Sequence, residues 1–247
     1  MQGNIDILVL TRPDVIKDIH SRYLEPGADI ITANTFSSQR ISMADYHCEH
    51  LVQELNREAV RIAREAVLDY QASDPARECF VIATVGPTNK TLSMSPDVSD
   101  PSYRAVTYDD MFEAYVEQMQ VLFDCNVDGI LLETIFDTLN CKAGIHAYQV
   151  VRQESTKDIP LMLSATVSDK AGRLLSGHTL EAFMASIQHA PILSVGLNCS
   201  FGAEDMISSL RILAEKAPYF ITAHPNAGLP NTLGGYDQTP EMMLTQM

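Results

Sequence analysis

The chain alternates between short continuous apolar runs and longer stretches in which apolar residues recur every three or four positions. The first pattern is typical of strands buried on both faces, and the second of helices with one apolar face. The runs that predict strands are residues 28–32, 80–85, 129–132, 161–167, 192–200 and 219–223. Helical patterns alternate with these runs, so the sequence predicts βα units on a parallel sheet.

Helices are predicted where the apolar period is helical and where residues that favour helix ends stand at its limits. Residues 11–23 predict a helix with Pro13 in its first turn. Its predicted buried face is formed by Val15, Ile19 and Tyr23. Thr107 and Asp110 have the spacing of a capping box and predict another helix start. The preceding residues, 88–106, are rich in Ser, Pro and Asp and predict a long loop, which is often functional.

Two α/β folds are compatible with this alternation, an open doubly wound sheet and a (β/α)8 barrel. The first predicts a glycine-rich phosphate turn after an early strand, and the chain contains neither G-x-G-x-x-G nor G-x-x-x-x-G-K, which favours the barrel. The barrel requires eight strands, and the last helical pattern, from Thr239, is short. We therefore expect one α/β domain over residues 1–247, a (β/α)8 TIM barrel truncated at both ends, without its first and last strands.

Composition narrows the possible partners and the compartment. The 32 acidic and 17 basic residues give a net charge of −15, which argues against binding to nucleic acid or to an anionic membrane. No run of about 18 apolar residues is present, and the amino terminus lacks the features of a signal peptide, so we expect a cytoplasmic protein. The five cysteines form no close-spaced pair, which excludes a disulfide framework and a complete local zinc motif.

Chemistry in a parallel barrel takes place at the carboxyl ends of the strands. The predicted strand ends carry Asn34-Thr35-Phe36, Gly86-Pro87-Thr88, Glu133-Thr134, Asn198-Cys199 and His224-Pro225-Asn226. A thiol, a carboxylate and an imidazole that meet at one mouth could form a zinc site, a nucleophile or an amine-binding pocket. From the residues alone, a lone cysteine at a strand end such as Cys199 is more often a small packed residue than a ligand. Glu133 could equally be a member of a structural ion pair.

The segment His47-Cys48-Glu49-His50 has a metal-like composition but a weak context. It stands at the start of an amphipathic helix, with no third ligand nearby, and we expect it to be exposed and remote from Cys199. The other three cysteines, at positions 79, 125 and 141, are interpreted as packing residues.

Several segments, taken in order, resemble one known family. They are ADIITANTF, VGPTNKTLSMSPDVSDP, LLETIFDTLNCKA, LSGHTLEAF, GLNCS and TAHPNAGLPN, and they span nearly the whole chain. Together they are similar to the homocysteine S-methyltransferase family, and within it to the homocysteine-binding module of cobalamin-dependent methionine synthases. A series of this length is far more specific than a lone cysteine.

The resemblance implies a (β/α)8 barrel in which zinc is held by three cysteine thiolates. One ligand follows the sixth strand and matches Cys199, whereas the adjacent pair that follows the eighth strand would lie beyond Met247. The family pattern often has an acidic residue two places before the Asn-Thr-Phe turn, where this chain has Thr32. A site with three cysteine ligands leaves the fourth tetrahedral position of zinc open, and a thiol that binds there is deprotonated.

The resemblance also implies the substrate contacts. Glu133 would receive the amino group of homocysteine, and the backbone around Thr35 and Phe36 would receive its carboxylate. Cys199 and Glu133 are thus the expected catalytic residues, and Asn198 is grouped with the substrate-binding residues.

The methyl donor that the resemblance implies is methylcobalamin on another module of the parent chain, recharged from 5-methyltetrahydrofolate by a folate module. One alternative is a self-contained barrel that takes the methyl group from betaine or S-methylmethionine. Another is a binding fragment without activity, because a single thiolate should hold zinc weakly.

Overall fold

Six parallel strands form one sheet in the part of the chain that the computed structural model describes, residues 3–228, 230–232 and 234–247. They are β1 (Ile30–Ala33), β2 (Phe80–Val85), β3 (Gly129–Ile135), β4 (Leu161–Ala165), β5 (Ile192–Gly202) and β6 (Phe220–Asn226). Each strand pairs in parallel with the next one in the sequence. Strand order therefore equals chain order, as in a barrel wall, whereas a doubly wound sheet reverses its order at a switch point.

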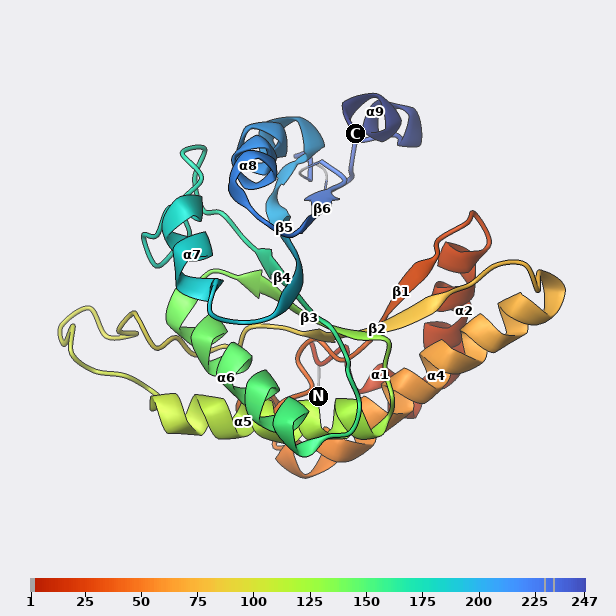
Figure 1. The fold of residues 1–247 in the computed structure, drawn as a ribbon, viewed down its shortest axis with the longest axis horizontal. Helices are drawn as coiled ribbons and strands as arrows, with labels where there is room; N and C mark the ends of the chain where they lie inside the picture. Colours follow the sequence, from red (N-terminus) through yellow and green to blue (C-terminus); the bar gives the residue numbers. More distant parts are fainter. Residues whose placement is uncertain (1–2, 229, 233) are drawn as a thin grey trace.

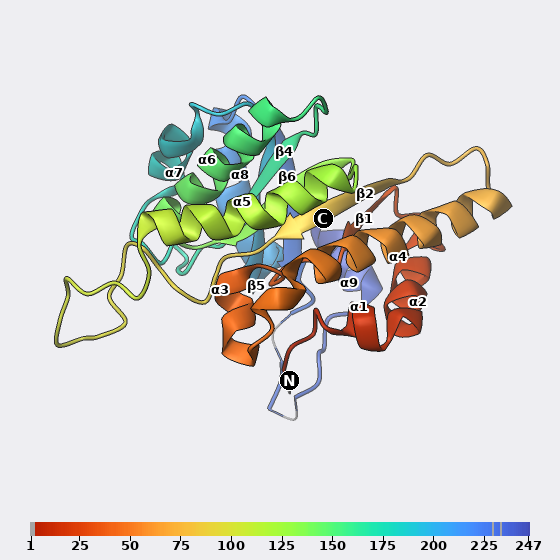
Figure 2. The same ribbon diagram turned by 90° about the horizontal axis from the view of Figure 1, so that it is seen from below.

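Helices cover the convex side of this curled sheet (Figures 1 and 2). The longer ones are α2 (Pro13–Leu24), α4 (Val52–Ser73), α5 (Tyr108–Asp124), α6 (Thr138–Glu154), α7 (Leu180–Ile187) and α8 (Ala203–Lys216). Shorter elements are α1 (Leu8–Thr11), α3 (Arg40–Met43), η1 (Ala44–Tyr46), η2 (Glu49–Leu51) and α9 (Pro240–Gln246). From α4 to α8, each of these longer helices packs on the next, so the wall is continuous. No helix within the described ranges is long and apolar enough to cross a membrane.

The sheet is a curled half-barrel. Within the described residues β1 and β6 are its two edge strands, and their first residues expose apolar side chains, Ile30 by 52% and Phe220 by 74%. The predicted α/β class and parallel sheet are confirmed, and all six predicted strands are present with ends shifted by a few residues. The arrangement is consistent with an incomplete TIM barrel.

The predicted face of α2 is wrong by one position. Ile19 and Tyr23 are 43% and 65% exposed. The buried residues are Ile16, His20 and Leu24. Apolar residues occupy two neighbouring stripes of this helix, and the periodic pattern alone does not distinguish them. Packing of α2 on α4 decides which stripe turns inward.

Two local signals are confirmed at the predicted places. Thr107 Oγ1 accepts the Asp110 N–H at 3.1 Å, and the Asp110 carboxylate accepts the Thr107 N–H at 2.8 Å, so the capping box starts α5. The long loop that precedes α5 extends away from the body of the molecule in Figure 1. Its base is tied to the start of α6, where Asp137 accepts the Ser93 N–H at 2.9 Å and Asn140 accepts the Leu92 N–H at 3.0 Å.

Gly196 sets the close approach of β5 and β6. A Cβ atom at this position would lie 2.1 Å from both the carbonyl oxygen and Oγ1 of Thr222. That distance is far inside van der Waals contact, so only glycine allows the two strands to pair here.

We expect Gly196→Ala to lower the free energy of unfolding by about 3 kcal/mol, because the added methyl must push the two strands apart. Urea denaturation monitored by circular dichroism measures this change. Gly202→Ala is the matched control, because the nearest atoms to its Cβ would be 4.0 Å away, and it should cost less than about 1 kcal/mol. Equal effects of the two substitutions would contradict the steric argument.

Candidate active site

The carboxyl ends of the strands meet at one edge of the sheet because all six run in the same direction. β1 leads into the turn that contains Thr35, β3 carries Glu133, and β5 carries Cys199. Asn198 lies opposite His224 in the pairing of β5 with β6. The predicted site residues of these strands thus gather at one mouth, although they are far apart in sequence.

Glu133 lies at an irregularity of β3. The register with β4 shifts between Leu132 and Ile135, and Thr134 has a φ of 56°, in the left-handed region. A residue other than glycine in this conformation is less stable by about 1–2 kcal/mol, so the surroundings must hold it. Bulges of this kind redirect side chains, and they are common next to active sites.

The Glu133 carboxyl group has no hydrogen-bond or ion-pair partner among the described residues. The side chain is half-buried, and this burial raises its pKa from 4.5 to about 7. A buried carboxylate without a partner is costly, and a cation placed beside it would offset that cost. Glu133 is therefore suited to receive an ammonium group.

Cys199 lies at a second irregularity, at the end of β5. The register with β6 shifts between Asn198 and Gly202, and Cys199 and Ser200 have φ values of 58° and 64°. All five cysteines of the chain lie in the described part, and Cys199 alone among them is exposed. The interpretation of the others as packing residues holds for the buried Cys79 and Cys141, and Cys125 is half-buried.

Asn198 does not present its side chain to the mouth as a free ligand. Its amide oxygen and nitrogen make four hydrogen bonds within the protein. These use the donors and acceptors that an asparagine side chain has, so its contribution to a site is to hold neighbouring residues in place.

The turn after β1 is held by its side chains and leaves one backbone donor free. Thr35 is completely buried, and its Oγ1 donates to the Thr84 carbonyl at 2.7 Å. Its own carbonyl accepts from Gln118, also at 2.7 Å, and the Phe36 carbonyl accepts the Gly86 N–H at 2.8 Å. The Phe36 N–H has no partner within the described residues and is available to an anion.

Asp6 belongs to this region and was missed in the sequence. Its side chain is 4% exposed and accepts the Ser37 N–H at 3.0 Å, which braces the turn after β1. Burial raises the pKa of Asp6 to about 6. The signal that could have revealed it is a single carboxylate inside the apolar run from Ile5 to Leu10, where an acidic residue needs a reason to be present.

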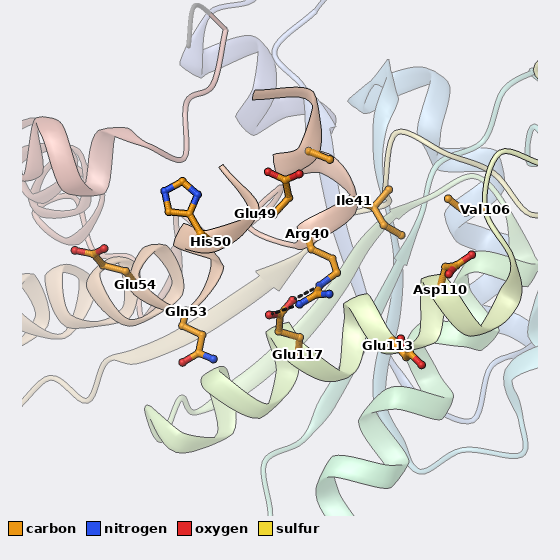
Figure 3. Close-up of a pocket in the computed structure, with 11 residues that line it drawn as sticks. Arg40, Ile41, Glu49, His50, Gln53, Glu54, Val106, Asp110, Glu113 and Glu117 are labelled. Atoms are coloured by element: carbon orange, nitrogen blue, oxygen red, sulfur yellow. Dashed lines mark hydrogen bonds and ion pairs between the residues drawn. The ribbon is translucent and has the colours of Figure 1, made fainter. Parts of the chain in front are cut away.

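The His-Cys-Glu-His segment lies on the outer wall. His47 and His50 are exposed as expected, but Cys48 is 1% exposed, because the chain turns inward between the short helices η1 and η2. His50 lines a cavity of about 810 Å³ between η2 and α5, in which Arg40 is paired with Glu117 at 2.7 Å (Figure 3). None of the strand-end residues lines this cavity.

Metal binding requires several ligands in one place. Among the described residues, no group of three or more His, Cys, Asp or Glu side chains is arranged to hold a metal ion. Cys199 is an exposed thiol at the mouth, but a single thiolate does not make a zinc site. The residues present therefore fit part of a zinc centre and not a complete one.

Comparison with known proteins decides the family. The family model described as homocysteine S-methyltransferase matches residues 3–247. The chain belongs to the homocysteine S-methyltransferase family. The expectation from its sequence segments is thus confirmed at the level of the family.

Solved structures agree with this assignment at the level of fold. The metallated form of the homocysteine methyltransferase MmuM from Escherichia coli superposes with a TM-score of 0.77 at 18% identity, over 100% of this chain and 83% of that one. The oxidized form gives a TM-score of 0.74 at 19% identity, over 89% of this chain and 73% of that one. At such identities the likeness establishes the architecture.

Glu133→Gln removes a carboxyl group whose ionised form is disfavoured by burial. Because the pKa rises on folding, the group stabilises the fold below about pH 4.5, and this contribution is lost as the pH rises through about 7. Across that window the variant should gain up to about 3 kcal/mol in unfolding free energy relative to the unchanged chain.

Urea denaturation at pH 4.5 and pH 8 measures this gain. Glu78→Gln serves as control, because Glu78 is an exposed glutamate before β2 without an ion-pair partner among the described residues, and its replacement should change the unfolding free energy by less than about 0.5 kcal/mol. Parallel pH profiles for Glu133→Gln and the unchanged chain would show that the carboxyl is not desolvated.

Proposed function

We infer that this chain is a homocysteine S-methyltransferase unit that binds the amino-acid end of homocysteine at the mouth of the half-barrel. The observation that carries this proposal is the Glu133 carboxyl group, half-buried and without a partner, at the same mouth as the exposed Cys199 thiol. Membership in the family supports homocysteine as the methyl acceptor.

The proposed contacts match a zwitterionic amino acid. Glu133 receives the ammonium group, and the free N–H of Phe36 receives the carboxylate. An ammonium beside Glu133 favours the ionised carboxylate, so binding near neutral pH is accompanied by loss of a proton from Glu133. The thiol of the bound molecule is then directed toward Cys199.

Zinc enters the proposal as a group that this chain binds in part. Cys199 supplies one thiolate, and no other side chains among the described residues complete a metal site with it. Zinc, when bound, deprotonates a coordinated thiol at neutral pH. The residues of this chain hold the amino acid in place for that chemistry.

The proposed donor is methylcobalamin, carried by another module of a methionine synthase and recharged from 5-methyltetrahydrofolate by a folate-binding module. The resemblance of this chain's sequence segments to the homocysteine-binding module of cobalamin-dependent methionine synthases supports this choice. We expect methionine to form from homocysteine and methylcobalamin in the zinc-loaded parent protein, and not from betaine or S-methylmethionine. Chromatographic measurement of methionine with each donor checks this. If methionine forms only with betaine or only with S-methylmethionine, that donor would replace methylcobalamin in the proposal.

Two substitutions separate the roles of the two proposed catalytic residues. Glu133→Gln should weaken homocysteine binding by about 2–4 kcal/mol, because a buried partner of the ammonium is lost, and should leave zinc content unchanged. Cys199→Ser should abolish stoichiometric zinc and methyl transfer with little effect on folding, since a hydroxyl is a harder and far less acidic donor than a thiol.

Zinc content and homocysteine affinity are measured on the same preparations of the parent protein. A Cys199→Ser protein that keeps a full complement of zinc and normal turnover would end the proposal for Cys199. Loss of zinc from Glu133→Gln would place the carboxylate among the metal's neighbours and not on the amino group.

A further inference from the structure

The side chain of Asn198 joins three strands at the mouth. Its Oδ1 accepts the Thr134 N–H at 3.0 Å and the Ser164 hydroxyl at 2.8 Å. Its Nδ2 donates to Thr134 Oγ1 at 2.8 Å and to Cys199 Sγ at 3.2 Å. Asn198 belongs to β5, Ser164 to β4 and Thr134 to β3, so one amide bridges residues that are up to 64 positions apart.

These bonds end on both irregularities that carry the candidate chemistry. Thr134 is the left-handed residue next to Glu133, and Cys199 is one of the two left-handed residues of the β5 irregularity. A left-handed conformation of a residue other than glycine persists where the surroundings over-determine it. Asn198 is 4% exposed, so its hydrogen bonds compete little with water.

We propose that Asn198 is a positioning residue that fixes the Cys199 sulfur relative to the Glu133 carboxyl group by holding the β3 and β5 irregularities together. We call these four hydrogen bonds of Asn198 the Asn198 tie. A catalytic role for the tie rests on the proposed function, because that role presumes that homocysteine spans Cys199 and Glu133. The tie itself consists of protein contacts alone and can be tested without substrate.

Asparagine is suited to this place because the tie needs two acceptor sites on one atom and two donors on the other. Aspartate would retain the bonds from the Thr134 N–H and the Ser164 hydroxyl, but it has no proton to donate to the Cys199 sulfur. Alanine would lose all four bonds. The two substitutions therefore separate the contact with β3 from the contact with the sulfur.

The first measurement is hydrogen exchange of the Thr134 amide in the purified chain, followed by NMR. We expect exchange at least about tenfold faster in Asn198→Ala, because a native hydrogen bond protects this N–H. In Asn198→Asp the protection should return to within about threefold of the unchanged chain, since the carboxylate accepts the same bond.

The second measurement is the rate of alkylation of Cys199 by iodoacetamide at pH 7.5, located by mass spectrometry. Cys199 is the exposed cysteine, so its modification is resolved from that of the other four. We expect alkylation slower by about threefold in Asn198→Ala, which lacks the N–H donor to sulfur. Asn198→Asp should be slower by about tenfold, because it also places a negative charge beside the thiolate.

Asn56→Ala is the matched control. Asn56 is a completely buried asparagine of α4 whose amide donates to the Ser38 and Val52 carbonyls, and it contacts neither Thr134 nor Cys199. Asn56→Ala should lower the melting temperature, as we expect for Asn198→Ala. It should leave the Cys199 alkylation rate unchanged, and it should not change the exchange rate of the Thr134 amide relative to neighbouring β3 amides.

Unchanged Thr134 exchange in Asn198→Ala, or unchanged alkylation in Asn198→Asp, would overturn the corresponding half of the proposal. Parallel changes in Asn56→Ala would reduce the effect to general stability and overturn both halves. Homocysteine affinity of the same variants provides the link to function, with weakening by about tenfold expected in Asn198→Ala. If the unchanged parent protein fails to bind homocysteine, the proposed function fails, while the exchange and alkylation results still decide the tie.

Discussion

The uniform direction of the strands is the constraint on which the rest of the molecule depends. Because β1 to β6 pair in parallel and in chain order, every carboxyl end lies at the same edge of the sheet. The helices that connect them must return along the outer side, which buries the strands between the wall and the interior. The turn after β1, the Glu133 carboxyl group and the Cys199 thiol therefore lie at one mouth, although they are far apart in the sequence.

Several features of this mouth lower the stability of the fold. Glu133 is half-buried without a partner, and Thr134 and Cys199 have left-handed backbone conformations. Both features are unfavourable in the absence of a ligand, and both are typical of ligand-binding and active sites. The hydrogen bonds of Asn198 offset part of this strain, because they link Thr134 of β3 to β5 across β4 and bind the Cys199 sulfur to the same amide.

Local patterns in the sequence determined the elements of the fold. Apolar runs placed the strands, the spacing of Thr107 and Asp110 placed the start of α5, and the order of the segments identified the family. Glu133 and Cys199 could also be selected as candidate site residues, since both stand at the ends of buried runs. Each of these signals lies within one segment of the chain, and such signals can be read without knowledge of the neighbours.

The tertiary structure decided what depends on partners that are distant in sequence. The buried stripe of α2 follows from its packing on α4, and Asp6 finds its role only through the Ser37 N–H. Asn198 stands next to Cys199 in the sequence and was grouped with substrate ligands, but its amide is engaged by Thr134, 64 positions away. A hydrogen bond depends on the position of two atoms in space, and strand register, which sets that position, is fixed by the packed sheet as a whole and not by the order of residues along one strand.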